Sequence, residues 1–395
     1  MFRLVSPRLA LALLAAGAAS VAAQGGGVTL TVDRGGAPGE VNLEWTGGEP
    51  RFRVFRSDEA RATVYSGNEI GDTAGSTWTD VPPPGAMFFY RVTGQVTVEA
   101  ATLSYGADSA QALDLHLPQV LPAAPMPVAL LAHGGLWQGG DKSALATLCQ
   151  EVVVESGGTM ACASTNYRLS QNLGGVCVAG GIDAYRYQVV DLALAFALLQ
   201  TESDVRGLDR TRMYVGGHSA GAHLSHELNL RWSDFEQPCA SPSGCWPAAG
   251  AIGFEGIFDI AAWDAYDAEF WDGEFFCATR KAFGFPGDPP SGCQDAQYGL
   301  PCWHIGSPTY LADNAGTLEV APVGDALIIH SPGDNWVDIA EATSFGQAMS
   351  AAFSEINVIT SIDGTCATGQ HNDPLTQTAL AVCIVNFIAL SGSGI

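Results

Sequence analysis

Positively charged residues are scarce in this chain. Lys and Arg together number 17 of 395 residues against 41 Asp and Glu, which gives a formal net charge of −24, and lysine occurs only at Lys142 and Lys281. A surface so poor in cations repels phosphate backbones and anionic lipid headgroups. The composition therefore argues against binding to nucleic acid or to a membrane surface. With 47% hydrophobic and 15% charged residues, it indicates a compact globular protein.

The chain also lacks a long apolar run. Its longest candidate, residues 9–19, is too short to span a bilayer. Arg3 and Arg8 precede this run, and the small residues 21–23 follow it, which is the pattern of a secretory signal. We therefore predict a signal peptide over residues 1–23, no membrane span, and a secreted, extracellular or periplasmic protein.

Cysteine is absent from the first 148 residues, and ten cysteines lie between Cys149 and Cys383. Export favours disulfides as their state, although the pairing does not follow from the sequence. Five of them (Cys239, Cys245, Cys277, Cys293 and Cys302) fall within one stretch of the chain, and five lie outside it. If all ten pair within the chain, at least one bridge must join that stretch to the rest. Because the compact CxxC…CxxC spacing of structural zinc sites is missing, we expect neither metal nor cofactor.

Residues 24–98 differ in pattern from the rest. Short segments of alternating apolar and polar residues, such as Val28 to Val32, Val41 to Trp45 and Phe88 to Val92, are separated by Gly, Asp and Pro turns. This pattern predicts a small all-β sandwich. The segments "VNLEWTGG", "FRVFRSD", "STWTDVPPPG" and "FFYRVTG" occur in an order that resembles a fibronectin type III module. Such a module has no readable function, and a spacer or weak contact role is expected.

Residues 99–395 alternate between continuous apolar runs and helical patterns. The runs "MPVALLA", "TMACAST", "RMYVGG", "AAGAIGF" and "ALIIH" are followed by segments such as "VVDLALAFALLQ" and "AGAHLSHELNL". Such runs are typical of parallel strands that are covered on both faces. The expected fold class is therefore α/β, with a mostly parallel sheet, helices on both faces and the small sandwich at the N-terminal end.

The chemistry centres on the motif Gly217-His218-Ser219-Ala220-Gly221. Because the chain has 47 glycines, the motif alone carries little weight. It lies, however, between the strand-like "RMYVG" and the helical "AGAHLSHEL", which is the context of a nucleophile elbow. The glycines leave room for the sharp turn. Ser219 is the predicted nucleophile.

A serine hydroxyl needs a base, and the base needs an orienting acid. With this elbow the chain order is Ser, then Asp or Glu, then His. His371, in the polar loop "CATGQHNDP", is the histidine that remains beyond the strand "ALIIH", and it is the predicted base. Asp334 follows that strand in "HSPGDNWVD" and is the predicted acid, with Asp338 as the alternative.

Acyl transfer also needs donors for the developing oxyanion. The turn His133-Gly134-Gly135 at the end of "VALLA" would supply the N–H groups of Gly135 and Leu136, and Ala220 would supply a third. Trp137 and Trp336 adjoin these loops and are predicted walls of a substrate pocket.

Taken together, residues 100–395 resemble the esterase/lipase branch of the α/β-hydrolase superfamily, near its bacterial feruloyl/acetyl esterase-like and kynurenine formamidase-like groups. The segments that carry the resemblance are "LSYG…LDLHLP", "HGGLWQGGDK", "NYRL", "VVDLALA", "LDRTRMYVGGHSAGAHL", "GIFD" and "SPTYLADN". Two features depart from the pattern: Leu136 stands where many relatives have glycine or an aromatic residue, and "HSPGD" replaces the commoner HG-x-x-D. The resemblance specifies the fold well and the substrate poorly.

Other polar and aromatic residues have plainer interpretations. His223, His226 and Glu227 lack the H-E-x-x-H spacing and are expected to pack in the helix after the elbow, and Asp191 is expected to be structural. Residues 232–312 are rich in aromatics and are predicted to form a cap-like insertion held by disulfides. The aromatic residues are Trp246, Phe254, Trp263, Phe270, Trp271, Phe276, Phe285 and Trp303.

The sequence thus predicts a secreted serine hydrolase that cleaves an ester through an acyl-enzyme. An amidase, formamidase or peptidase with the same triad is the nearest alternative, and a non-catalytic binding protein is a more distant one. The acyl group, the alcohol, the oligomeric state and whether the ester is a small molecule or linked to a polymer stay open.

Overall fold

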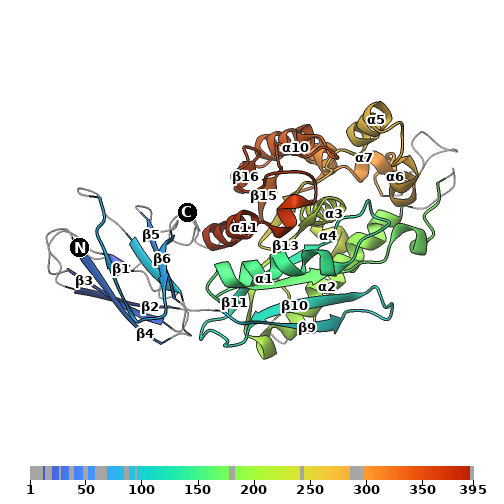
Figure 1. Cartoon of the computed structure of the whole chain (residues 1–395). Helices are drawn as coiled ribbons and strands as arrows, with labels where there is room; N and C mark the ends of the chain where they lie inside the picture. Colours follow the sequence, from blue (N-terminus) through green and yellow to red (C-terminus); the bar gives the residue numbers. More distant parts are fainter. Residues whose placement is uncertain are drawn as a thin grey trace.

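The computed structural model describes residues 12–13, 20–25, 28–34, 40–47, 52–57, 69–83, 89–93, 96–177, 183–240, 244–284, 295 and 297–391. Figure 1 shows a small all-β unit at the N-terminal end and a larger unit of mixed helices and strands. Much of the predicted signal peptide, together with Phe88, Phe285 and Cys293, lies outside the described residues.

The small unit consists of two antiparallel four-stranded sheets. One has the order β1-β8-β5-β6 and the other β2-β3-β4-β7. Their core contains Leu30, Val32, Leu43 and Trp45 from one sheet, and Val54, Tyr90 and Val92 from the other. The strands are β1 (Ala12–Leu13), β2 (Ser20–Gly25), β3 (Val28–Arg34), β4 (Val41–Gly47), β5 (Phe52–Ser57), β6 (Glu69–Thr73), β7 (Thr77–Asp80) and β8 (Phe89–Thr93).

Two of these strands overlap the predicted signal peptide. β1 pairs with β8, and β2 pairs with β3 from Ser20 to Gly25. Cleavage after residue 23 would therefore remove β1 and most of β2, each of which is an edge strand of its sheet. The signal peptide and the fibronectin-like assignment both stay predictions.

The larger unit is built on one eight-stranded sheet of order β16-β15-β14-β13-β11-β12-β10-β9. The six strands β12, β11, β13, β14, β15 and β16 run parallel to their neighbours in this order. β10 pairs antiparallel with both β12 and β9. The strands are β9 (Val98–Ser104), β10 (Ala112–Pro118), β11 (Met126–Ala132), β12 (Ala161–Thr165), β13 (Leu208–His218), β14 (Gly250–Phe254), β15 (Asp325–Ile329) and β16 (Val358–Ser361). β11, β12 and β14 are buried along their whole length, as the apolar runs predict.

Helices cover both faces of this sheet. Apolar side chains of α1 (Ala146–Glu155) and α11 (Thr378–Ser391) pack on one face. α2 (Ala184–Arg206), α3 (Ala220–Leu230) and α10 (Ile339–Ala352) pack on the other. The mostly parallel sheet between two helical layers is the predicted fold class (Figure 1). Among the described residues, no helix is both long and apolar enough to cross a bilayer.

The predicted insertion over residues 232–312 is wrong in its bounds. β14 lies inside this range but belongs to the centre of the sheet, between β13 and β15, and all five of its residues are buried. The helices that cover the sheet edge come after it. They are α5 (Ile260–Phe270), α6 (Phe276–Phe283), α7 (Cys302–Ile305), α8 (Pro308–Asp313) and α9 (Ala315–Leu318), and α4 (Trp232–Phe235) precedes β14.

Disulfides link several of these elements. The bridges are Cys149–Cys162, Cys177–Cys277, Cys239–Cys245 and Cys366–Cys383, and Cys302 is also in a disulfide. Cys177–Cys277 joins the segment before α2 to α6. It therefore connects the stretch that contains five cysteines to the rest of the chain, as the odd number of cysteines in that stretch predicts.

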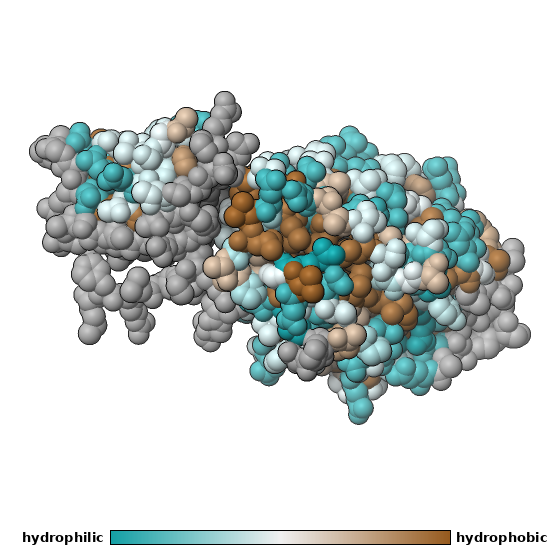
Figure 2. All heavy atoms as spheres, turned by 90° about the horizontal axis from the view of Figure 1, so that it is seen from below, coloured by the Kyte–Doolittle hydropathy of each residue, from teal (hydrophilic) through white to brown (hydrophobic). Residues whose placement is uncertain are grey.

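The two units meet through at least one ion pair. The guanidinium of Arg53 on β5 lies 2.8 Å from the carboxylate of Glu155 at the end of α1, and the side chain of Glu155 is 3% exposed. Figure 2, a view from below, shows hydrophobic residues of the larger unit gathered toward the smaller one among hydrophilic neighbours.

Candidate active site

Ser219 lies on a tight turn between β13 and α3. Its φ of +53° is rare for a residue with a side chain, so the turn holds Ser219 in a strained conformation. A Cβ at Gly217 would lie 2.4 Å, and one at Gly221 2.1 Å, from the carbonyl oxygen of Ala132 on β11. Glycine at both positions is therefore required for this close approach. The Ser219 N–H donates to Phe254 O at 3.0 Å, which ties the turn to β14.

Asp334 and His371 form a hydrogen-bonded pair. His371 Nδ1 donates to Asp334 Oδ2 at 2.7 Å, and the Asp334 side chain is fully buried. The N–H groups of Trp336 and Val337 donate to Asp334 Oδ1 at 2.8 and 3.2 Å. Burial would raise the pKa of Asp334, but the hydrogen bond and charge of His371 outweigh burial and lower that pKa. With its Nδ1 proton fixed in this way, His371 has Nε2 available as a base.

Ser219 and His371 line the same pocket. Both side chains are described, and no hydrogen bond joins them. Catalytic contacts of this kind often tighten only when a substrate is bound. The pocket therefore brings Ser219, His371 and, behind the imidazole, Asp334 into one constellation, while Asp338 caps α10 by accepting from the Ala340 N–H at 2.8 Å.

The loop after β11 has the geometry of a tight glycine turn. Gly135 has a φ of +120°, and a Cβ there would lie 2.4 Å from Gly139 O. Gly135 and Leu136 line the pocket beside Ser219, and Ala220 opens α3. His133 lies under the loop: its Nδ1 donates to Gly134 O at 2.7 Å, and its ring stacks on Tyr167.

The two tryptophans predicted as pocket walls have different positions. Trp336 lines the pocket, and its ring stacks on His371 with centroids 5.6 Å apart and planes 10° apart. Trp137, by contrast, is fully buried in the core and does not line the pocket, so its predicted role as a wall is wrong. Trp137 has a φ of +60°, and its Nε1 donates to His223 Nδ1 at 3.3 Å.

The pocket has a volume of about 490 Å³, within the range of small-molecule sites. Trp263 of α5 and Phe275, just before α6, contribute to it, so the helices after β14 do cover the site. Apart from Ser219, His218 and His371, the lining is largely apolar. The other lining residues are Gly134, Gly135, Leu136, Gln138, Gly139, Gly140, Ala144, Leu145, Trp263, Phe275, Trp336, Val337, Asn372 and Leu375.

Two neighbours of Asp334 and His371 were not predicted from the sequence. His218 Nε2 donates to the backbone oxygen of His371 at 2.8 Å, and burial lowers the pKa of His218 to about 3, so this imidazole is neutral. Glu255, directly after β14, is fully buried and offers a carboxyl oxygen within 4.8 Å of one of Asp334. β14 is the neighbour of β15, and Asp334 comes after β15. An acidic residue directly after β14 is therefore the signal that could have identified Glu255.

Glu255, His330 and Asp334 offer three ligand atoms within 4.8 Å of one another, a grouping that could hold a metal ion. Each group nevertheless has a protein partner. Asp334 Oδ2 accepts from His371, the Glu255 oxygens accept from the Ser331 N–H, and His330 Nε2 donates to Val337 O at 3.1 Å. This geometry is that of a hydrogen-bond network around Asp334.

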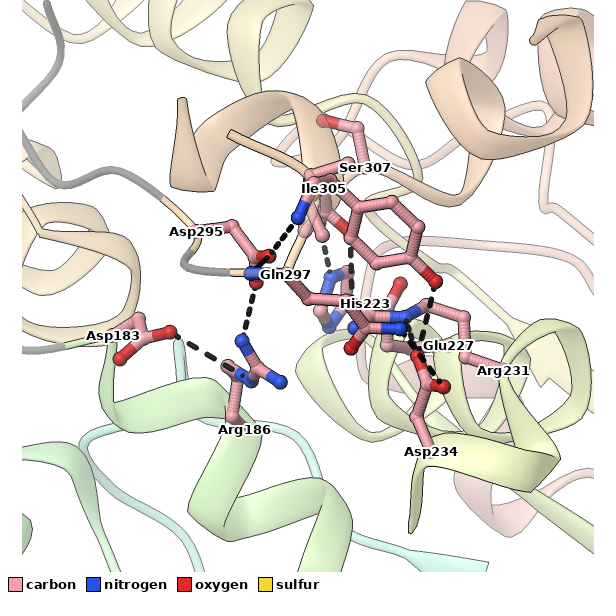
Figure 3. A network of polar contacts seen from close by, with 12 residues as sticks. Asp183, Arg186, His223, Glu227, Arg231, Asp234, Asp295, Gln297, Ile305 and Ser307 are labelled. Carbon is pink, nitrogen blue, oxygen red and sulfur yellow. Dashed lines mark hydrogen bonds and ion pairs between the residues drawn. The ribbon is translucent and has the colours of Figure 1, made fainter. Parts of the chain in front are cut away.

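The polar residues of α3 pack as predicted. His223 Nε2 donates to Gly306 O, and the Glu227 carboxylate pairs with Arg231 at 2.9 Å, both in the interior (Figure 3). His226 is also fully buried. Asp191 accepts hydrogen bonds from Gln111 and Arg168 and is likewise structural.

Comparison with known proteins gives a consistent result. The BD-FAE family model matches residues 113–272, which include the glycine turn and the Ser219 elbow but end before Asp334 and His371. Esterase LipC of Mycobacterium tuberculosis (strain ATCC 25618 / H37Rv) is 28% identical over 156 residues, which are 39% of this chain and 36% of LipC. The chain thus matches about a third of the length of this curated relative.

Solved structures share the fold at low identity. A truncated form of a carbohydrate esterase from gut microbiota has a TM-score of 0.55 at 17% identity, with 76% of this chain and 98% of that chain covered. Esterase B from Lactobacillus Rhamnosis (HN001) has a TM-score of 0.55 at 16% identity, with 75% and 86% covered. The chain thus has the α/β-hydrolase fold, and its residues 113–272 match the BD-FAE family model.

Proposed function

We propose that this protein is an exported serine hydrolase that cleaves carboxylic esters. The observation that carries the proposal is the hydrogen bond from His371 Nδ1 to the buried Asp334, with the imidazole in the same pocket as the strained Ser219. A positioned nucleophile, a base with a fixed tautomer and an orienting acid are the parts that acyl transfer requires.

The reaction follows from these positions. Ser219 Oγ attacks the ester carbonyl carbon while its proton passes to His371 Nε2, and the charge on the carbonyl oxygen is held by N–H groups from Gly135, Leu136 and Ala220. His371 then gives the proton to the departing alcohol, which leaves an acyl group on Ser219. Water, deprotonated by His371, attacks this acyl-enzyme, and the carboxylic acid is released.

The relatives support an ester as the bond that is cleaved. LipC is named an esterase, and the two structural relatives described above are titled as esterases. The largely apolar pocket of about 490 Å³ fits an acyl or alcohol group of a small molecule, or one ester group attached to a polymer. Amide cleavage by the same triad is the alternative that a substrate panel separates.

Export is supported by the cysteines. Bridges such as Cys149–Cys162 and Cys366–Cys383 persist in oxidising compartments and are rare in the reducing cytosol of mesophiles. Together with the signal-like residues 1–23, they favour an extracellular or periplasmic destination.

The test is labelling by a fluorophosphonate probe together with hydrolysis of p-nitrophenyl acetate. We expect the wild type to be labelled and active, and Ser219→Ala to be unlabelled and inactive because the attacking oxygen is gone. Ser143→Ala, which alters an exposed serine near the glycine turn, is the matched control and should behave as wild type. Retained labelling and turnover in Ser219→Ala would refute the proposal. A panel of acetyl, feruloyl, longer-chain and amide substrates then identifies the bond and acyl group.

A further inference from the structure

Glu255 and Asp334 approach each other because two neighbouring parallel strands end at the same edge of the sheet. In the register of β14 and β15, Phe254 is opposite Ile329. Glu255 follows Phe254 directly, and Asp334 follows Ile329 after a turn of four residues. Glu255 has a φ of +53° and is fully buried, so its side chain is held toward this edge by a strained backbone.

The contacts of Glu255 keep it in place. Its backbone N–H donates to Ile329 O at 3.0 Å, and its two carboxyl oxygens lie 3.0 and 3.1 Å from the Ser331 N–H. Ser331 in turn donates its hydroxyl proton to Gly369 O at 2.6 Å, two residues before His371. Glu255 thus holds the turn that carries the acid, and that turn is tied to the loop that carries the base.

Glu255 and Asp334 offer carboxyl oxygens within 4.8 Å of one another, and His330 Nε2 lies 3.5 Å from an oxygen of each. Because two adjacent negative charges away from water are strongly unfavourable, one of the two carboxyl groups holds a proton. Asp334 is the better anion of the two. It accepts the His371 Nδ1–H and two backbone N–H groups, whereas Glu255 accepts one backbone N–H, that of Ser331. His330 Nε2 is equally distant from both carboxyl groups and therefore favours neither as the anion. Burial, with the hydrogen bond and charge of Asp334, raises the pKa of Glu255. The proton therefore resides on Glu255.

We propose that Glu255 is a positioning residue of this hydrolase: it carries a proton at neutral pH and donates it in a hydrogen bond to Asp334. This inference rests on the proposed function, because it assigns a partner to the acid of the same triad. When His371 takes the proton of Ser219, the imidazolium contacts the carboxylate of Asp334. The hydrogen bond from Glu255 keeps that carboxylate in its orientation. Above neutral pH, loss of the Glu255 proton removes this donor and places a second negative charge beside Asp334.

The experiment compares Glu255→Gln with wild type. Glutamine can donate an N–H to Asp334 and accept from Ser331 with its oxygen, but it cannot titrate. We expect kcat/KM for p-nitrophenyl acetate near pH 7 to stay within about threefold of wild type. On the alkaline side, the wild type should lose activity and Glu255→Gln should keep it. The infrared difference spectrum of wild type minus variant, at neutral pH, should contain the C=O band of a protonated carboxyl.

The matched control is Glu341→Gln, which changes another buried glutamate that does not line the pocket. Its alkaline activity profile should be that of wild type. Glu255→Ala should lower kcat about tenfold at unchanged KM, because Glu255 does not touch the substrate. Should this variant fail to fold, Glu255→Gln still decides the matter.

Identical alkaline profiles for wild type and Glu255→Gln, or an infrared difference without the carboxyl band, would overturn the inference. Fluorophosphonate labelling of Ser219 keeps the two proposals separate. If labelling requires Ser219 but the Glu255 variants behave as wild type, only the role of Glu255 is lost. If Ser219→Ala stays active, the proposed function itself fails.

Discussion

Asp334 and Asp338 lie four residues apart and have different environments. The carboxylate of Asp334 is fully buried against His371, whereas Asp338 caps α10 through the Ala340 N–H. The first carboxylate can therefore fix the tautomer of the base, and the second stabilises the start of a helix.

Replacing each aspartate by asparagine tests this difference. In Asp334→Asn the amide cannot accept the His371 Nδ1–H in the same way, so the base loses its tautomer, and kcat should fall about 10³- to 10⁴-fold. In Asp338→Asn the cap is kept, because asparagine is as good an N-cap as aspartate, and kcat should stay within about twofold. Initial rates with p-nitrophenyl acetate measure both, and the reverse order of effects would move the acid to Asp338.

The sequence identifies those site residues whose positions follow from their order along the chain. It does not identify those whose positions depend on side-chain packing. Ser219, Asp334 and His371 follow from the elbow and the strand ends. The structure places Ser219 and His371 in one pocket and Asp334 in a hydrogen bond with His371, although their roles stay a proposal. Trp137 adjoins the glycine turn in sequence, but its ring is fully buried in the core against His223 and Phe283. Glu255 is recognisable only when the register of β14 and β15 is known.

Helix α10 begins beside a second buried acid, Glu341. Both the Phe258 and Asp259 N–H groups donate to Glu341 Oε2 at 2.7 Å, so this carboxyl connects the first turn of α10 to the segment before α5. Burial raises the pKa of Glu341 to about 8, against the effect of these two hydrogen bonds. The folded protein thus holds a proton here that the unfolded chain releases near pH 4.5.

The sign of the pH dependence follows from that difference. Between about pH 4.5 and 8 the folded state binds more protons at Glu341 than the unfolded state, so the free energy of unfolding should fall as the pH rises through this window. Glu341→Gln removes this titration, and its stability should fall less steeply over the same range. Urea unfolding at pH 5, 6.5 and 8 measures the two slopes, and parallel curves for variant and wild type would contradict the assignment.

Helices and strands were predicted well where the apolar pattern extended over many residues. The segment "VVDLALAFALLQ" lies in α2, and the apolar runs form the parallel strands. The predicted bounds of the insertion, 232–312, enclose the apolar run "AAGAIGF", although that run by itself predicts a strand. It forms β14 (Gly250–Phe254), which pairs with β13 and β15 inside the sheet.

The whole molecule combines two units, with the pocket in the larger one. The covering helices of that unit are attached to the scaffold by the Cys177–Cys277 bridge, whose partners are 100 residues apart. Phe275, two residues before Cys277, lines the pocket. The position of this pocket wall therefore depends on a covalent link.

Removal of this bridge should affect both stability and catalysis. Because a long closed loop restricts the unfolded chain most, Cys177→Ser with Cys277→Ser should lower the free energy of unfolding by about 2–4 kcal/mol. It should also lower kcat/KM as the wall formed by Phe275 loosens. Cys239→Ser with Cys245→Ser opens a bridge between partners only six residues apart and is the control. Denaturant unfolding and ester hydrolysis should show a smaller change in the control, and equal losses in the two double variants would contradict the link.

Disulfide bridges also determine whether the two fragments produced by a single peptide-bond cleavage can come apart. Ser219 lies within the loop closed by Cys177 and Cys277, and His371 lies within the one closed by Cys366 and Cys383. A protease that cuts once inside either loop leaves its two fragments covalently attached, so the nicked molecule migrates as one species until a reductant is added. After such a nick, Ser219 and His371 would each remain on a covalently continuous molecule.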